Sequence, residues 1–77
     1  MASTERIRVC IAGATGQVGR CLVPAVVAAE DLELVSAVAR RAAGRDLGEA
    51  LGGNPLGLTI MADLAPALDV GVDVLID

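Results

Sequence analysis

Seven consecutive residues near the N-terminus have the types and the spacing that bind a phosphate group. The segment follows the pattern G-x-x-G-x-x-G and reads Gly13-Ala14-Thr15-Gly16-Gln17-Val18-Gly19. Glycine allows a tight turn, and the missing side chain of Gly16 leaves room for a pyrophosphate beside the backbone. If a helix begins here, its first N–H groups point at the phosphate and its dipole favours the negative charge. We expect Gly13 to Val18 to bind a dinucleotide; the alternative is a turn that only joins a strand to a helix.

A second chemical feature lies about twenty residues beyond the last glycine of this pattern. Dinucleotide sites that prefer NAD usually place an acid there, which binds the ribose hydroxyls. This chain has Ala39 at that point, followed by Arg40 and Arg41. A guanidinium binds a 2′-phosphate through two parallel hydrogen bonds, whereas an acid would repel it. We therefore expect Arg40 to bind the 2′-phosphate of NADPH, with NADH a possible but less favoured cofactor. The alternative is that both arginines are solvated loop charges.

Four other residues could take part in chemistry, but each has a simpler interpretation. Cys10 and Cys21 are expected to be packing residues, since a reactive thiol needs an exposed and electropositive setting. Arg20 can contact a phosphate or form a surface ion pair. Asp77 falls at the carboxyl end of an apolar segment, where it can face a cofactor crevice or cap a following segment.

The residue types that are missing exclude several functions. The chain contains no His, Lys, Phe, Tyr or Trp, and its formal net charge is −4. Nucleic-acid binding needs aromatic platforms or a basic face, and the chain has neither. Two cysteines without histidine make no common zinc site, and the usual general bases and Schiff-base nucleophiles are missing. We expect no metal ligand, no catalytic residue and no nucleic-acid partner in this chain.

The same composition points to a reduced compartment. Residues 1–6 lack the apolar core of a signal peptide, and no apolar run approaches the roughly 18 residues of a membrane span. The two cysteines fall in a strand pattern and a helix pattern, which indicates no disulfide framework. We expect a cytoplasmic protein without a membrane partner.

Strand and helix patterns alternate along the chain and must position these residues. Short apolar runs typical of buried parallel strands are residues Ile7–Ala12, Leu32–Ala39, Leu58–Met61 and Val72–Asp77. Helical patterns separate them, first from residue 18 to 29 and then in the short segments Asp46–Leu51 and Asp63–Leu68. The predicted order is therefore βαβαβαβ.

Each predicted helix carries a signal at its start or on its face. The first shows an apolar stripe made of Val18, Cys21, Leu22, Ala25, Val26 and Ala29. Gly19 would let this helix pack close to the first strand, and Pro24 should kink it or mark its solvent face. Asp46 and Asp63 are the predicted N-caps of the two short helices.

Alternating strands and helices with short connections predict a doubly wound parallel sheet of the Rossmann-like α/β class. The last strand would be a bare apolar edge, which natural domains avoid. We therefore expect residues 1–77 to be the N-terminal part of a dinucleotide-binding domain, truncated after the fourth strand. The catalytic and substrate domain would then be absent from this chain.

With these residues in view, the chain resembles the N-terminal part of the 4-hydroxy-tetrahydrodipicolinate (dihydrodipicolinate) reductases of bacterial lysine biosynthesis. The resemblance covers nearly all of the chain. Its residues are Ile7–Ala14, the turn with Gly16, Val18, Gly19 and Arg20, then Glu30–Val35, Gly44–Gly53 with its core Asp46-Leu47-Gly48, and Val72–Asp77. The glycine turn alone is shared with many reductases, and the combination with the later segments is more specific.

The resemblance implies hydride transfer from NADPH or NADH to a cyclic imine dicarboxylate, in an enzyme that these residues only begin. The family's nucleotide stretch falls on Gly13 to Val18 and its phosphate-binding arginine on Arg40. Its ribose-binding acid falls on Ala39, a departure that puts tight NAD binding in doubt. The family's His-His-Arg-x-Lys region, which carries catalysis, has no counterpart here. The full-length protein is expected to be a homo-oligomer in diaminopimelate and lysine biosynthesis.

Three other interpretations remain open at this point. Extended short-chain reductases often carry Gly-Ala-Thr-Gly at their first turn and need a later Tyr-x-x-x-Lys. A non-catalytic NADP-sensing module would use the same glycines and arginines to report redox state. Under the third interpretation, the isolated chain binds no ligand because its sheet is incomplete.

Overall fold

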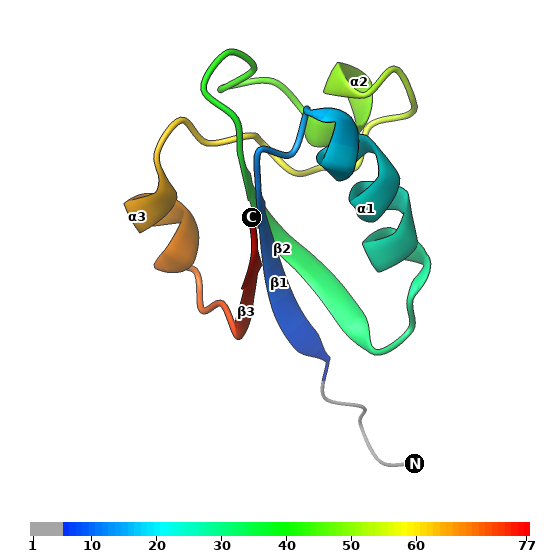
Figure 1. Cartoon of the computed structure of the whole chain (residues 1–77), viewed down its shortest axis with the longest axis vertical. Helices are drawn as coiled ribbons and strands as arrows, with labels where there is room; N and C mark the ends of the chain where they lie inside the picture. The colour runs from blue at the N-terminus through cyan, green and yellow to red at the C-terminus, as the bar shows by residue number, and fades with distance from the viewer. Residues whose placement is uncertain (1–5) are drawn as a thin grey trace.

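Three parallel strands form the sheet of this chain, whose computed structural model describes residues 6–77 (Figure 1). The strands are β1 (Ile7–Ala12), β2 (Leu32–Val38) and β3 (Val74–Ile76), in the spatial order β2-β1-β3. Both outer strands run parallel to β1, so the carboxyl ends of all three point to one edge of the sheet. The predicted α/β class with a parallel sheet is confirmed.

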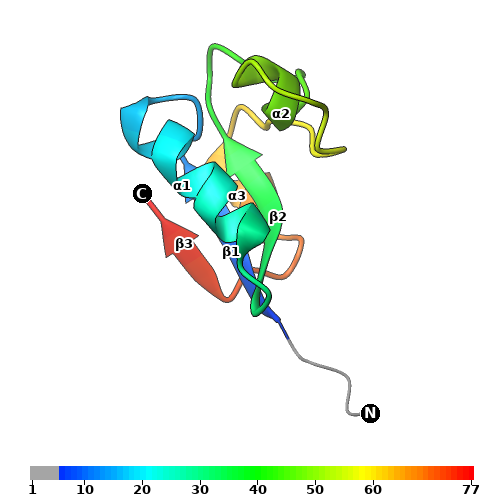
Figure 2. The ribbon, with the colours of Figure 1, turned by 90° about the vertical axis from the view of Figure 1, so that its right-hand side faces the viewer.

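Helices cover both faces of this sheet, as expected for a doubly wound arrangement. The helices are α1 (Gln17–Ala28), α2 (Leu47–Ala50) and α3 (Leu64–Leu68). Figures 1 and 2 show α1 on one face and α3 on the other. Ser36 of β2 is fully buried and donates its Oγ–H to the carbonyl oxygen of Ala67 at 2.8 Å, which attaches α3 to the sheet.

The face that α1 turns toward the sheet differs from the predicted stripe. The buried residues of this helix are Gly19, Val23 and Val26. Val18 is 65% exposed and Cys21 is also exposed, so the prediction that Cys21 is a packing residue is wrong. Cys10 is buried, which confirms the same prediction for that residue. The reason for the different face of α1 is steric: a Cβ on Gly19 would overlap the backbone of Ala14, so the helix rests on its glycine. The helix continues through Pro24, which lies on the exposed side.

The predicted third strand, Leu58–Met61, is an extended segment and not a strand. Thr59 forms a single antiparallel bridge to Asp46, and Met61 forms a single parallel bridge to Val38. Because the segment changes partner between these two residues, no ladder of consecutive pairs forms. Met61 nevertheless lies beside β2, on the side away from β1, which corresponds to the 3-2-1-4 strand order of dinucleotide-binding sheets.

Two further boundaries differ from the sequence prediction. The last strand is three residues long, and Asp73 directly before it exchanges two hydrogen bonds with Arg8. The Arg8 N–H donates to the Asp73 carboxylate at 2.9 Å, and the Asp73 N–H donates to the Arg8 carbonyl at 2.8 Å. Asp63 does occupy the N-cap position of α3, but its side chain makes no cap hydrogen bond within the described residues. Asp46, in contrast, caps α2 as predicted, accepting from the Glu49 N–H.

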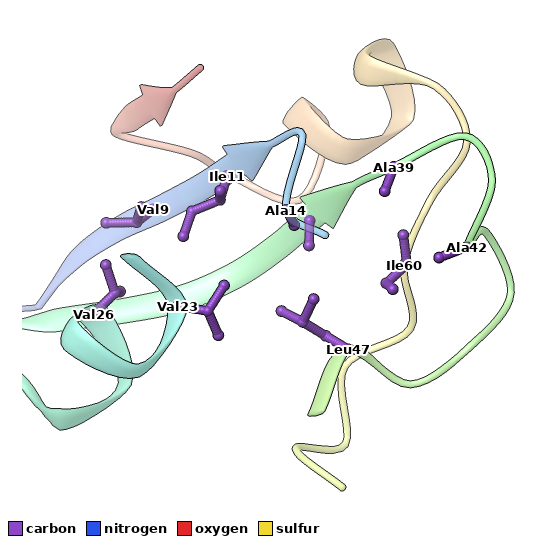
Figure 3. Close-up of a cluster of buried hydrophobic side chains, with 10 residues drawn as sticks. Val9, Ile11, Ala14, Val23, Val26, Ala39, Ala42, Leu47 and Ile60 are labelled. Carbon is purple, nitrogen blue, oxygen red and sulfur yellow. The ribbon is translucent and has the colours of Figure 1, made fainter. Parts of the chain in front are cut away.

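The apolar core continues past the carboxyl ends of the strands. Val9 and Ile11 of β1 pack toward Val23 and Val26 of α1 (Figure 3). Beyond the sheet, the same cluster includes Leu47, Ile60, Ala39 and Ala42, all buried. Residues 40–45, which we call the arginine loop, therefore lie over packed side chains.

No helix among residues 6–77 has the length and apolar character to cross a bilayer. The expectation about a signal peptide concerns residues 1–6, and the first five of these lie outside the described residues.

The contact of Gly19 with Ala14 gives a first prediction. Gly19→Ala should destabilise the fold by about 3 kcal/mol, because the new methyl group can only be accommodated by moving α1 off the turn. Urea unfolding followed by far-ultraviolet circular dichroism measures the change.

Gly53→Ala is the matched control. Its Cβ would meet the nearest atom at 3.7 Å, an ordinary van der Waals contact, so the variant should unfold at the wild-type urea concentration or slightly above it. Equal destabilisation by the two substitutions would contradict the close-packing explanation.

Candidate functional site

The glycine turn is joined to the end of β2 through one carbonyl group. The N–H groups of Gly13 and Ala14 both donate to the carbonyl oxygen of Val38, at 2.8 and 3.1 Å. Val38 is the last residue of β2, and Arg40 follows it by two residues. The turn that opens α1 and the start of the arginine loop are therefore held at the same edge of the sheet.

Backbone donors at the start of α1 fall into two groups. The N–H groups of Gly13, Ala14 and Gly16 already donate to carbonyl oxygens of Val38 and Gly13. Those of Thr15, Gln17, Val18 and Gly19 have no acceptor among residues 6–77, because the first intrahelical bond into this end is donated by Arg20. In the part of the chain that the structure describes, no side chain caps this end of the helix. Four free donors at a helix N-terminus form an environment that favours an anion.

Some of the predicted nucleotide-binding residues are buried and shape the turn, and others are exposed to solvent. Ala14 is fully buried and serves the packing under Gly19. Gly13 adopts a φ of +69°, which glycine takes without strain. Gly16 is exposed, and a Cβ there would sit 3.3 Å from the Gly13 carbonyl oxygen, a tight contact at the mouth of the turn. Together with exposed Gln17 and Val18, this leaves the backbone at the start of α1, which we call the cradle, open to solvent.

The arginine loop presents its charges to solvent while its backbone is fixed. Arg40 and Arg41 are exposed, and neither forms an ion pair with an acid within residues 6–77. Ala42 is buried beneath them. Ile60 holds the rest of the loop from below: its carbonyl accepts from the Gly44 N–H and its N–H donates to the Arg45 carbonyl, both at 2.8 Å. The chain's own contacts therefore hold the backbone of the loop.

The carboxylate of Asp46, at the end of this loop, accepts four backbone N–H groups. Its Oδ2 accepts from Glu49 at 3.1 Å and Leu56 at 3.0 Å, and its Oδ1 accepts from Gly57 at 2.8 Å and Leu58 at 3.1 Å. The hydrogen bond from Leu56 is the largest cause lowering the Asp46 pKa; partial desolvation opposes it and the other three bonds add to it. The sequence suggested only the helix cap, because nothing in the pattern signals a bond to residues ten to twelve positions away.

The remaining candidates stay peripheral. Arg20 is exposed on α1, and Asp77 is exposed just after β3, at the same edge of the sheet as the turn. Among the described residues no three metal-ligating side chains come together. An apolar groove of about 410 Å³ runs between α1 and the segment after α2, lined in part by Val23, Val27 and Leu51. None of the predicted nucleotide-binding residues lines it, so it is a separate surface.

This geometry agrees with the outcome of comparing the chain with known proteins. The family described as "Dihydrodipicolinate reductase, N-terminus" matches residues 7–77, which is nearly the whole chain. The chain belongs to this family. The match runs through the glycine turn, the arginine loop and β3, so it includes every element of the candidate site.

Relatives in this family carry the name 4-hydroxy-tetrahydrodipicolinate reductase. The protein of Desulfitobacterium hafniense is 39% identical over 75 residues, covering 95% of this chain and 28% of that protein. The Anaeromyxobacter protein is 46% identical over 72 residues (92% and 26%), and that of Alkalilimnicola ehrlichii is 47% identical over 73 residues (91% and 27%). The chain thus spans little more than a quarter of the length of these reductases.

The Asp46 geometry predicts how the stability of this family member changes with pH. The fold lowers the Asp46 pKa below its ordinary 3.8, so the ionised carboxylate stabilises the folded state above pH 3.8. This contribution is lost as the pH falls through the folded-state pKa. The difference in unfolding free energy between wild type and Asp46→Asn should therefore be largest near neutral pH and narrow toward about pH 3.

Urea unfolding at a series of pH values measures this difference. A difference that stays constant from neutral pH down to the acid range would show that the charge of Asp46 contributes nothing to the fold.

Proposed function

We propose that this chain is the nucleotide-binding part of a reductase of the dihydrodipicolinate reductase type, and that it binds NADPH in preference to NADH. The observation that carries the proposal is the double hydrogen bond to the Val38 carbonyl. It holds a helix N-terminus with free N–H donors beside a loop whose two arginines, Arg40 and Arg41, have no acidic partner among residues 6–77. Pyrophosphate and 2′-phosphate, the two anionic parts of NADPH, require these two kinds of partner.

The cradle of α1 would bind the pyrophosphate through backbone groups. The N–H groups of Thr15, Gln17 and Val18 are the donors that the fold leaves free at the exposed mouth of the turn. Gly13 and Gly16 contribute by shape, since one allows the turn and the other leaves space for the ligand. Ala14 contributes through its N–H bond to Val38 and its buried side chain, which hold the cradle in place.

Arg40 would select the cofactor. Its guanidinium is exposed and has no acidic partner among residues 6–77, so binding a phosphate breaks no ion pair there. Ala39 precedes it and is buried, and its side chain has no polar group to bind a ribose hydroxyl. NADPH gains a charged contact at this point and NADH gains none, which favours NADPH.

The activity of the whole enzyme follows from the family. Bound NADPH would supply a hydride, and the acceptor would be the cyclic imine dicarboxylate of lysine and diaminopimelate biosynthesis. The chain has no His, Lys or Tyr to donate a proton to that substrate, so its own residues bind and orient the cofactor. We expect the 77-residue chain to bind NADPH weakly and to turn over no substrate; the full-length protein would be a cytoplasmic homo-oligomer.

The assignment of Arg40 is tested by substitution. Arg40→Ala should weaken NADPH binding on the order of tenfold, through loss of a charge-assisted hydrogen bond, and leave NADH binding unchanged. Titration followed by the fluorescence of the reduced nicotinamide gives both dissociation constants, and the chain has no Trp or Tyr to interfere.

Arg6→Ala is the matched control, because it removes the same charge at the amino end of β1, the opposite edge of the sheet. Equal losses of NADPH affinity in the two variants would mean that only net charge matters, and the assignment of Arg40 would fail.

A second substitution tests the cradle. Gly16→Ala would add a methyl group at the proposed pyrophosphate site. The backbone φ of −78° suits alanine, and the Gly13 carbonyl oxygen, 3.3 Å from the new Cβ, must shift by a few tenths of an ångström. Both NADPH and NADH share the pyrophosphate, so we expect both affinities to fall by about tenfold, unlike the selective effect of Arg40→Ala. Unchanged binding of both cofactors by the folded variant would show that the ligand does not enter this turn.

A further inference from the structure

The position of Arg40 depends on a loop that the sheet alone does not hold. The arginine loop begins two residues after Val38, the last residue of β2, and none of its residues belongs to a strand. Its anchors are the buried side chain of Ala42 and the two hydrogen bonds to Ile60. Ile60 belongs to the extended segment that has only isolated bridges to its neighbours. The loop is therefore only as well ordered as that segment.

Contacts at both ends hold this segment. At Met61 the N–H donates to the Ala37 carbonyl at 2.9 Å and the carbonyl accepts from the Ala39 N–H at 3.0 Å, whereas Asp46 holds the residues before Thr59. Three of the four N–H groups that bind this carboxylate come from residues 56–58, directly before the bridge at Thr59. The Leu47 N–H also donates to the Leu58 carbonyl at 2.8 Å, and the Leu47 side chain is fully buried beside Ile60 (Figure 3). The Asp46 carboxylate thus closes a ring that runs from the arginine loop to residues 56–58 and back through Ile60.

We propose that Asp46 is a positioning residue for cofactor selection: its carboxylate fixes residues 56–58, and through Ile60 it fixes the loop that carries Arg40. This inference rests on the proposed binding of the 2′-phosphate by Arg40. It assigns to Asp46 no contact with the cofactor. A guanidinium binds the 2′-phosphate only when its N–H groups are correctly placed. If the loop moves, the protein should therefore bind NADPH more weakly and NADH equally well.

Asp46→Asn tests the proposal, with Asp63→Asn as the matched control. The asparagine amide keeps one acceptor oxygen and turns an NH₂ group toward backbone donors, so one pair of bonds is lost. Asp63 also stands at a helix N-cap, but its side chain makes no cap bond within the described residues, and its substitution changes the net charge equally. We expect about a tenfold weaker NADPH affinity for Asp46→Asn relative to Asp63→Asn, and less than a twofold change for NADH.

A second measurement reports on the loop without any cofactor. Amide hydrogen exchange at Gly44 and Ile60, whose N–H groups form the two bonds of the loop, should accelerate by about tenfold in Asp46→Asn and stay unchanged in Asp63→Asn. Exchange at Gly13, bonded to Val38, should not change in either variant. If Asp46→Asn fails to fold, the same two measurements are made on Asp46→Ser. The shorter serine side chain keeps an oxygen for the helix cap but does not reach residues 56–58.

Equal losses of NADPH and NADH affinity, or unchanged exchange at Gly44 in a folded variant, would overturn the role of Asp46. A failure of the proposed function gives a different result. If Arg40→Ala leaves the preference for NADPH unchanged, the phosphate contact is wrong and the positioning role falls with it. If Arg40→Ala removes the preference and the Asp46 variants retain it, only the role of Asp46 is wrong.

Discussion

The carbonyl oxygen of Val38 carries the interaction on which the arrangement of this site depends. It accepts the N–H groups of both Gly13 and Ala14, and so joins two segments that lie more than twenty residues apart. Buried backbone groups must find partners, and here one carbonyl satisfies two donors of a turn that cannot bond within its own helix. The free donors of α1 and the exposed arginines are thereby held at one edge of the sheet by backbone hydrogen bonds.

Small side chains make this arrangement possible. Gly19 lets α1 rest directly on the backbone of Ala14, and Ala39 and Ala42 let Ile60 and Leu47 fill the space beyond the ends of the strands. A chain in which 55% of the residues are hydrophobic and none is aromatic suits such thin layers. The same composition, rich in small apolar side chains, allows the core to reach beneath the arginine loop.

The sequence predicted the parts of the fold whose signals are local. β1, β2 and the Asp46 cap appear where strand patterns and capping rules place them. The face of α1 was misplaced because Val18, Cys21 and Ala25 form an apolar row beside the true one, and periodicity does not register that a glycine makes the closest contact. The segment Leu58–Met61 has strand-like residues, but whether it forms a strand depends on pairing partners far away in sequence. The Val38 carbonyl and the reach of Asp46 involve backbone groups, which leave no trace in a residue pattern.

The two halves of the proposed site use different chemistry, and this bears on how cofactor choice is set. The cradle offers backbone N–H groups, which any residue supplies, so pyrophosphate binding depends mainly on the glycines that shape the turn. The arginine loop offers a side chain, so in the proposed site the distinction between NADPH and NADH would rest on Arg40 and on the residues next to it. Removing the guanidinium would abolish the proposed 2′-phosphate contact without creating a ribose contact, because the side chain of Ala39 has no polar atom and is part of the core. A preference for NADH would therefore require a new hydrogen-bonding group at this edge together with a repacking around Ala39, Ala42 and Ile60, whereas the preference for NADPH needs one correctly held arginine.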